Sequence, residues 1–198
     1  MATEHTEIKS GASLLSPNTA SAVLRWWKSG SSKSKIRKGR KFMKEKYYIA
    51  YGSNLNVRQM MERCPLAKIK GVSEIPDYEL LFKGSKTGSY LTIEPRKNSK
   101  VPVAIWTITE EDEKALDRYE GFPTFYYKKE MKLPVTFLSG ETRNIDAFAY
   151  IMHENRKIGM PAFYYVETCL EGYQIFGFDQ KHLIKALKKS KSQSIGGK

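Results

Sequence analysis

Two short segments of this sequence carry residues whose types and spacing could do chemistry. In the segment Tyr51–Leu55 (YGSNL), a glycine follows an apolar run and precedes a helical pattern. A turn at such a glycine can direct successive backbone N–H groups at one point, where a carboxylate or an oxyanion would bind. The same pattern also fits a simple strand-to-helix connection, with Gly52 for the geometry and an asparagine as the helix cap.

The second segment ends at Glu120, the last residue of a predicted helix that stops at Gly121. Carbonyl groups make this end of a helix electrically negative and disfavour a carboxylate, and departures from a local rule often serve function. Partial enclosure by Tyr119, Phe122 and Phe125 would raise the pKa of Glu120. Such a group can accept and later donate a proton near neutral pH. The alternative is a solvated surface glutamate.

Other catalytic signatures are missing from the sequence. The three histidines, His5, His153 and His182, are scattered, and no Cys/His or His/carboxylate spacing suggests zinc. No Gly-x-Ser-x-Gly nucleophile elbow occurs. The run Gly84–Gly88 resembles a phosphate loop only superficially, because it falls between strands and does not open a helix. We therefore expect neither a metal site nor nucleotide binding there.

The elements that must position these residues alternate between strands and helices. An apolar, β-rich run predicts a strand over 46–51, and Asn56 with Gln59 three residues later predicts a capped helix that Pro65 ends. Further strands are expected at 78–82, 90–93, 101–108, 126–135 and 144–152, with a polar turn over 94–100 and helices over 109–120 and 161–172. This order predicts one α+β domain with a mixed, curled sheet flanked by helices.

The formal net charge of +13 is concentrated at the two ends of the chain. Residues 1–42 contain nine Lys or Arg against two Glu, and residues 181–198 contain six Lys and no acid, while the middle is neutral. Like-charge blocks at termini are usually solvated tails. We expect a basic, disordered extension over 1–42, a domain over 43–187 and a Lys/Ser-rich tail over 188–198.

The basic ends fit several roles. They could bind nucleic acid, although the neutral core makes that partner unexpected. They could also touch an anionic membrane or aid solubility, and Met43 could be an alternative start. Cys64 and Cys169 lie in apolar runs and indicate reduced thiols in a cytosolic protein. No apolar run approaches the 18 residues typical of a membrane span.

The two chemical segments together are more specific than either alone. The YGSNL run, followed about 65 residues later by Asp117-x-x-Glu120-Gly121, resembles the γ-glutamylcyclotransferase family, the AIG2-like superfamily. The resemblance covers residues 46–187. It includes Leu91-Thr92-Ile93, Val103–Trp106, Tyr126, Tyr150-Ile151-Met152, and Tyr165 with Gly172 and Gly177 in the closing segment.

The resemblance implies a γ-glutamylcyclotransferase-like fold, with a mixed curled sheet or small barrel flanked by helices. It implies a cytosolic enzyme, monomeric or homodimeric, that releases an amine from a small γ-glutamyl substrate and forms 5-oxoproline. Glu120 would be the catalytic acid and base, and no cofactor is implied. The implied substrate-binding residues are Tyr51, Gly52, Ser53, Asn54, Leu55, Tyr126 and Tyr165.

Some roles remain open even within this resemblance. Tyr126 and Tyr165 could hydrogen-bond the substrate or Glu120, or they could be amphipathic tyrosines of the core. Asp117 is expected to stabilise its helix or turn. The segments 122–125 and 152–160 depart from the family pattern, which leaves the amine partner undefined. A specialised γ-glutamylamine cyclotransferase and a catalytically silent binding or regulatory module are the alternatives.

Overall fold

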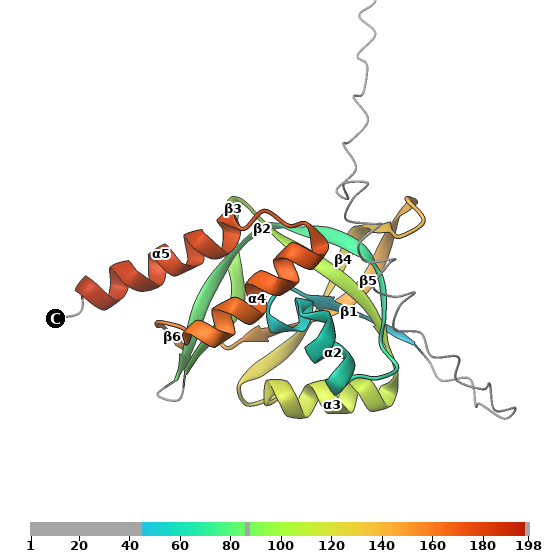
Figure 1. Ribbon diagram of the computed structural model, residues 1–198, viewed down its shortest axis with the longest axis horizontal. Coiled ribbons are helices and arrows are strands. Elements are labelled where there is room, and N and C mark those ends of the chain that lie inside the picture. The colour runs from blue at the N-terminus through green and yellow to red at the C-terminus, as the bar shows by residue number, and fades with distance from the viewer. Residues whose placement is uncertain (1–44, 86–87, 197–198) are drawn as a thin grey trace, which may run out of the picture.

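A computed structural model describes residues 45–85 and 88–196, so the expected extension over 1–42 lies outside the described residues. The described elements follow in this order: β1 (Lys46–Ala50), the short 3-10 helix η1 (Ser53–Leu55), α2 (Val57–Arg63), β2 (Lys68–Ser85), β3 (Gly88–Ile108), α3 (Glu110–Glu120), β4 (Tyr126–Phe137), β5 (Thr142–Met152), β6 (Lys157–Ile158), α4 (Phe163–Phe176) and α5 (Lys181–Gly196). Figure 1 shows these elements along the chain.

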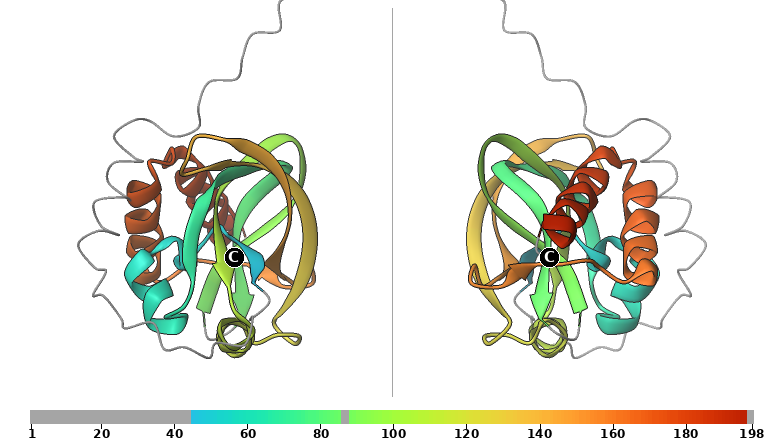
Figure 2. Two further views of the ribbon diagram at one scale, coloured as in Figure 1. Left: turned by 90° about the vertical axis from the view of Figure 1, so that its right-hand side faces the viewer. Right: turned by 90° about the vertical axis from the view of Figure 1, so that its left-hand side faces the viewer.

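The strands form one sheet that closes on itself. Their order is β3-β1-β5-β4-β2-β6, and an additional pairing of β3 with β2 closes the first five into a barrel. β1 runs parallel to β5, and the other pairs are antiparallel. Helices α2 and α4 lie on one side of the barrel, while α3 crosses one end (Figure 2). The predicted mixed, curled sheet flanked by helices is therefore confirmed.

The hairpin of β2 and β3 corrects two sequence predictions. β2 begins at Lys68, well before the predicted strand at 78–82, and β3 is one strand across the predicted polar turn at 94–100. Residues on both sides of that segment pair with the same neighbouring strand, and only 96–99 bulge out opposite Asp77. The Asn98 N–H donates to Asp77 Oδ1 at 2.8 Å. The polar residues therefore form a bulge within a strand, and no chain reversal occurs there.

Apolar side chains fill the barrel and the space beneath the helices. All residues of the stretch Val101–Ile108 are buried, which means that both faces of this part of β3 are covered. Trp106 and Ile49 are among the largest fully buried side chains, from two strands paired side by side. A rigid wall of paired strands therefore lies under the N-terminal turn that follows β1.

The predicted start and end of α3 are confirmed, whereas the C-terminal helices differ from the prediction. Thr109 and Asp112 form a reciprocal capping box at the start of α3, and Gly121 ends the helix with a left-handed φ of 64°. The last helix does not stop near Gly172, since α4 continues to Phe176 and ends at Gly177.

The predicted Lys/Ser-rich tail over 188–198 is also partly helical. α5 runs from Lys181 to Gly196 and packs against β2. Leu183 and Ala186 point into the core at helical spacing. These few apolar residues are enough to dock a helix whose other positions are lysine and serine. No helix in the described ranges is long and apolar enough to cross a membrane.

Candidate active site

The YGSNL segment forms a tight turn between β1 and α2. Leu55 N donates to Gly52 O at 2.9 Å, and Asn56 N donates to Ser53 O at 3.0 Å. The first N–H groups of a short helix have no acceptor within that helix, so those of Ser53 and Asn54 are available to a ligand. Asn56 caps α2 by accepting from Gln59 N at 3.2 Å, as predicted.

Helix α4 holds this turn in place from behind. Gly172 lies so close to it that a Cβ there would come within 2.4 Å of Leu55 Cβ and 2.7 Å of the Leu55 carbonyl carbon. Only glycine permits that approach without a shift of the backbone. The closing segment of the chain therefore fixes the position of a turn made more than a hundred residues earlier.

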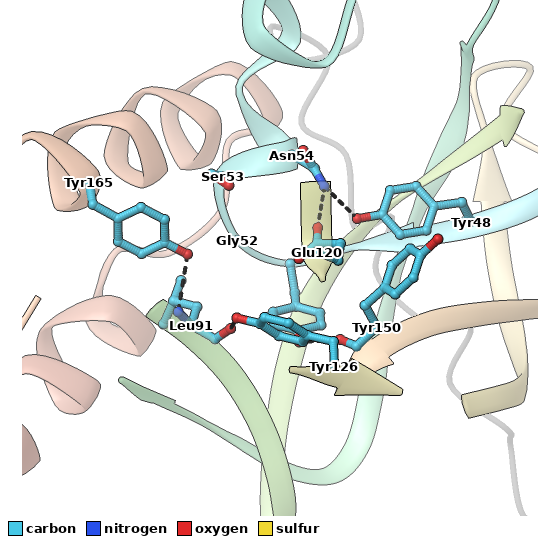
Figure 3. A pocket seen from close by; sticks show the side chains of 10 residues that line it. Tyr48, Gly52, Ser53, Asn54, Leu91, Glu120, Tyr126, Tyr150 and Tyr165 are labelled. Atoms are coloured by element: carbon cyan, nitrogen blue, oxygen red, sulfur yellow. Dashed lines mark hydrogen bonds between the residues drawn. The ribbon is translucent and has the colours of Figure 1, made fainter. Parts of the chain in front are cut away.

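Glu120 lies at the end of α3 and contacts this turn directly. The Asn54 side-chain amide donates to Glu120 Oε1 at 2.9 Å. Figure 3 shows Glu120 beside Asn54, with Gly52 and Ser53 in the adjoining turn. The two segments that the sequence analysis singled out, 66 residues apart, thus meet at one hydrogen bond.

The Asn54 amide is oriented by two further partners. Its Oδ1 accepts from Arg63 at 2.8 Å, and its Nδ2 also donates to the Tyr48 hydroxyl at 2.8 Å. Arg63 is itself held by Gln59 Oε1 at 2.7 Å and lies 3.7 Å from the centre of the Tyr119 ring. Because arginine can only donate, the amide nitrogen must face Glu120.

The electrostatic environment of Glu120 is the unusual feature of this site. The residue is half-buried, and burial raises the pKa of its carboxyl to about 7, against the opposing effects of Arg63 and of the hydrogen bond from Asn54. Glu120 is therefore present in both protonation states near neutral pH. A freely solvated surface glutamate, the alternative interpretation, would not behave in this way.

The two tyrosines from the family resemblance also line the site, and their hydroxyls hold one backbone position. The Tyr126 hydroxyl donates to Leu91 O at 2.9 Å, and Leu91 N donates to the Tyr165 hydroxyl at 3.1 Å. Neither hydroxyl is hydrogen-bonded to Glu120. A Cβ placed on Gly52 would lie 3.4 Å from the Tyr165 hydroxyl, which therefore reaches the turn.

Two adjoining cavities open around these residues. The smaller, about 30 Å³, is lined by Tyr48, Tyr51, Gly52, Ser53, Asn54, Leu91, Glu120, Tyr126, Tyr150 and Tyr165. The larger, about 360 Å³, is lined by Tyr90, Arg118, Tyr119, Glu120, Gly121, Phe125, Tyr126 and Tyr165. Leu55 lines neither cavity and is fully buried behind the turn. Glu120 is thus shared by both spaces and can reach a ligand in either.

Several site residues were not found from the sequence. Tyr48 and Arg63 position Asn54, and Tyr150 lines the small cavity while its hydroxyl donates to Asp117 at 2.6 Å. Asp117 also pairs with Lys128 at 2.7 Å, in keeping with its expected stabilising role. The helical spacing of Gln59 and Arg63 on α2 was the one available signal.

No group of three or more His, Cys, Asp or Glu side chains that could hold a metal ion occurs within 45–85 and 88–196. The polar groups that line the small cavity are amides, the Ser53 hydroxyl, tyrosine hydroxyls and one carboxyl. Such a set can bind an anion through N–H groups and can move a proton through the carboxyl.

A family model described as gamma-glutamyl cyclotransferase, AIG2-like, matches residues 48–167. This range contains the turn, Glu120, Tyr126 and Tyr165. No curated protein sequence matches the chain.

Solved structures that share the fold include the following three. One described as a gamma-glutamyl cyclotransferase is 24% identical with a TM-score of 0.63, covering 72% of this chain and 86% of that one. An uncharacterized protein from Homo sapiens, loc79017, is 25% identical with a TM-score of 0.62 and the same coverage. YkqA from Bacillus subtilis is 16% identical with a TM-score of 0.60, covering 75% of this chain and 55% of that one.

Proposed function

Because this chain belongs to the gamma-glutamyl cyclotransferase, AIG2-like family, we propose that it cleaves γ-glutamyl amides by cyclising the γ-glutamyl group to 5-oxoproline. The observation that carries this proposal is the 2.9 Å hydrogen bond between Asn54 and Glu120. It joins a carboxyl with a pKa of about 7 to a turn with free N–H groups. An acid/base and an anion site are the two parts that the reaction requires.

In the proposed complex, the γ-glutamyl group binds over the turn. The N–H groups of Ser53 and Asn54 would bind its α-carboxylate or the oxygen of its γ-carbonyl, which becomes negatively charged in the transition state. The Tyr165 hydroxyl, which accepts from Leu91 N, lines the small cavity and would contact the ligand there. The small cavity of about 30 Å³ has room for such an oxygen group, since one water needs only about 10–15 Å³.

The chemical step uses Glu120 twice. The neutral α-amine nitrogen attacks the γ-carbonyl carbon, a C–N bond forms, and Glu120 takes a proton from that nitrogen. The tetrahedral intermediate then collapses, the original amide C–N bond breaks, and Glu120 gives the proton to the departing nitrogen. The products are 5-oxoproline and a free amine, and Glu120 returns to its carboxylate form.

This reaction needs only a modest set of protein groups, because the nucleophile and the electrophile belong to one molecule. Well-oriented intramolecular attack can lower a barrier by about 7–11 kcal/mol. The protein would supply the correct folded conformation of the substrate, N–H groups for the oxyanion and a proton carrier. We propose Tyr51, Gly52, Ser53, Asn54, Leu55, Tyr126 and Tyr165 as the residues that bind the γ-glutamyl group or form the wall around it.

The test is 5-oxoproline release from a panel of γ-glutamyl amino acids and amines. We expect release by the native chain and its loss in Glu120→Gln. Glu111→Gln is the matched control, since Glu111 is an exposed carboxylate on the same helix and should leave the rate unchanged. Release that survives Glu120→Gln would mean that another group is the acid/base.

A silent binding module is the second candidate. It would bind the same γ-glutamyl compounds at the turn without turnover, and calorimetry would detect binding with no 5-oxoproline formed. The raised pKa of Glu120 favours the enzyme, because a purely binding site gains nothing from a carboxyl that titrates near neutrality.

The compartment and assembly state follow as smaller proposals. We place the reaction in the cytosol, where thiols stay reduced, because Cys64 and Cys169 are both free and buried. We also propose a monomer or a homodimer. Cell fractionation and light scattering would check these two points.

A further inference from the structure

The larger cavity next to Glu120 has a wall that differs in chemistry from the turn. Its volume of about 360 Å³ is large enough for an amino-acid side chain and backbone. Five of its eight lining residues are aromatic, which makes the space suited to an apolar occupant: Tyr90, Tyr119, Phe125, Tyr126 and Tyr165. Glu120 is common to both cavities, so a ligand that passes Glu120 extends from one into the other.

The aromatic wall is held in a fixed arrangement. The ring of Tyr90 is edge-on to that of Tyr165, with centroids 5.1 Å apart and an interplanar angle of 88°. Tyr90 and Phe125 meet at 6.4 Å and 77°, and Phe125 lies 5.3 Å from Tyr126. Edge-to-face contacts of this kind are favourable and directional. An aromatic ring entering the cavity would meet a preformed surface with suitable faces and edges.

One cation stands at the edge of this cavity. Arg118 is exposed on α3, and none of the ion pairs or side-chain hydrogen bonds within 45–85 and 88–196 involves its guanidinium. Arg63 on α2 differs, because its guanidinium hydrogen-bonds Asn54 and Gln59 and stacks on the Tyr119 ring. A free guanidinium beside an apolar cavity fits a carboxylate, which it can bind through two parallel N–H···O contacts.

We infer that the larger cavity binds the departing half of the substrate, and that this half is an α-amino acid with an aromatic side chain whose carboxylate pairs with Arg118. The inference rests on the proposed function, in which Glu120 hands a proton to the departing nitrogen. That nitrogen must lie at Glu120, so the rest of the departing group lies in the larger cavity. The aromatic wall then contacts its side chain.

The same geometry disfavours other departing groups. A small amino acid such as alanine would leave most of the aromatic wall without contacts. An amine with an aromatic side chain but no carboxylate could not form the ion pair with Arg118. A departing group with a second ammonium, such as lysine or a polyamine, would bring like charge to the guanidinium.

The experiment compares kcat/KM for three γ-glutamyl amides with the same acyl half, namely those of phenylalanine, alanine and phenethylamine. Phenethylamine is phenylalanine without its carboxylate. We expect the phenylalanine amide to exceed each of the others by at least about tenfold, since one charge-assisted hydrogen bond or one filled apolar pocket corresponds to that range.

Variants then separate the two contacts. Arg118→Gln should lower kcat/KM for the phenylalanine amide about tenfold or more and leave the phenethylamine amide unchanged. Phe125→Leu should lower kcat/KM for the phenylalanine and phenethylamine amides and leave kcat/KM for the alanine amide unchanged. Lys114→Gln, an exposed cation one turn earlier on the same helix, is the matched control and should change none of them.

The outcomes distinguish this inference from the proposed function. Equal kcat/KM for all three amides, with release still dependent on Glu120, would overturn the inference and leave the proposed function standing. An equal effect of Arg118→Gln on the phenylalanine and phenethylamine amides would overturn the role of Arg118 as the carboxylate partner. Absence of 5-oxoproline from every substrate would overturn the proposed function and this inference with it.

Discussion

Helix α3 carries three carboxylates on one face, and the surroundings of two of them, Glu113 near its start and Glu120 at its end, move their pKa values in opposite directions. Burial raises the pKa of Glu113, but hydrogen bonds from Lys128 and Lys46, each at 2.7 Å, outweigh it and hold the pKa below its usual value. For Glu120, burial dominates, and Arg63 and Asn54 lower the pKa only back to about 7.

The difference shows how one helix supports a structural charge and a titrating one. Seven residues make two turns, so both side chains project from the same face. Glu113 is compensated by two cations in contact with it and stays ionised. Glu120 receives one amide hydrogen bond, and Arg63, whose charge lowers its pKa, is hydrogen-bonded to Asn54 and not to Glu120. Direct contacts with two lysines outweigh burial at Glu113, whereas burial prevails at Glu120.

The largest expected effect comes from removing the titrating carboxyl. Glu120→Gln should lower kcat for 5-oxoproline release by at least about 10²-fold, the range for loss of a general acid/base. Glu113→Gln should stay within a few-fold of the native rate, because its carboxyl is not in either cavity. A comparable loss in both variants would mean that the helix as a whole is required and that Glu120 has no special role.

The pH profile is the next test of the comparison. Glu120 must be a carboxylate to accept the first proton, and the substrate's α-amine must be neutral to attack. With an amine pKa of about 8, kcat/KM should fall about tenfold per pH unit below that value and about a hundredfold per unit below the pKa of Glu120 near 7. Glu113, which is ionised throughout that range, should not affect the pH dependence of kcat/KM there. A profile flat down to pH 5 would contradict the raised pKa.

Glu113→Gln and Glu120→Gln should change the free energy of unfolding in opposite directions. Glu113→Gln removes the carboxylate that Lys46 and Lys128 share and leaves Lys128 paired with Asp117 alone, so it should lower the free energy of unfolding at pH 7 by about 1–2 kcal/mol. Because the folded pKa of Glu113 is depressed, its stabilisation is present above the unfolded value and is lost as pH falls through the folded value. Urea unfolding at several pH values measures both effects.

Ionisation of Glu120 has the opposite effect on the free energy of unfolding. Its folded pKa of about 7 lies above the unfolded value near 4.3, so ionisation costs stability above pH 7 and the cost disappears toward pH 4. Glu120→Gln should therefore stabilise the fold at pH 8, by about 1–2 kcal/mol after allowance for the half-exposed side chain. A lower free energy of unfolding for Glu120→Gln than for the native chain at pH 8 would contradict this prediction.

The smallest expected effect concerns Arg63. Its charge lowers the pKa of Glu120, so Arg63→Met should move the acidic limb of the kcat/KM profile to higher pH. Arg58→Met, on the same helix and exposed in an ion pair with Glu62, is the control that should leave the limb in place. A shift to lower pH would mean that Asn54, once released from Arg63, binds the carboxylate more strongly.

The sequence predicted those parts of the site that lie where elements end. Gly52 and Gly121 mark a strand end and a helix end, and each carries a candidate chemical group beside it. Their meeting could only be inferred from the family resemblance, since it depends on the barrel. Tyr48 and Arg63 could not be predicted as site residues, because a strand tyrosine and a helix arginine show no special sequence pattern. Their role is visible only in the structure, where both hydrogen-bond Asn54.

The errors in the fold have a similar physical cause. Pairing of β2 with β3 holds the polar residues 94–100 in a strand, and local composition cannot reveal a partner strand. In α5, Leu183 and Ala186 are too few to predict a helix among lysines, yet contact with β2 is enough to dock it.

Contacts between distant parts of the chain have a consequence for synthesis. Asn54 reaches Glu120 across 66 residues, Leu91 reaches Tyr165 across 74, and Tyr51 donates to Tyr150 O across 99. A nascent polypeptide that has emerged only as far as β5 contains the turn and Glu120 but lacks α4 and its Gly172 contact with Leu55. The proposed turnover would therefore begin only after α4 has left the ribosome, and product formation would report the completion of tertiary structure during translation.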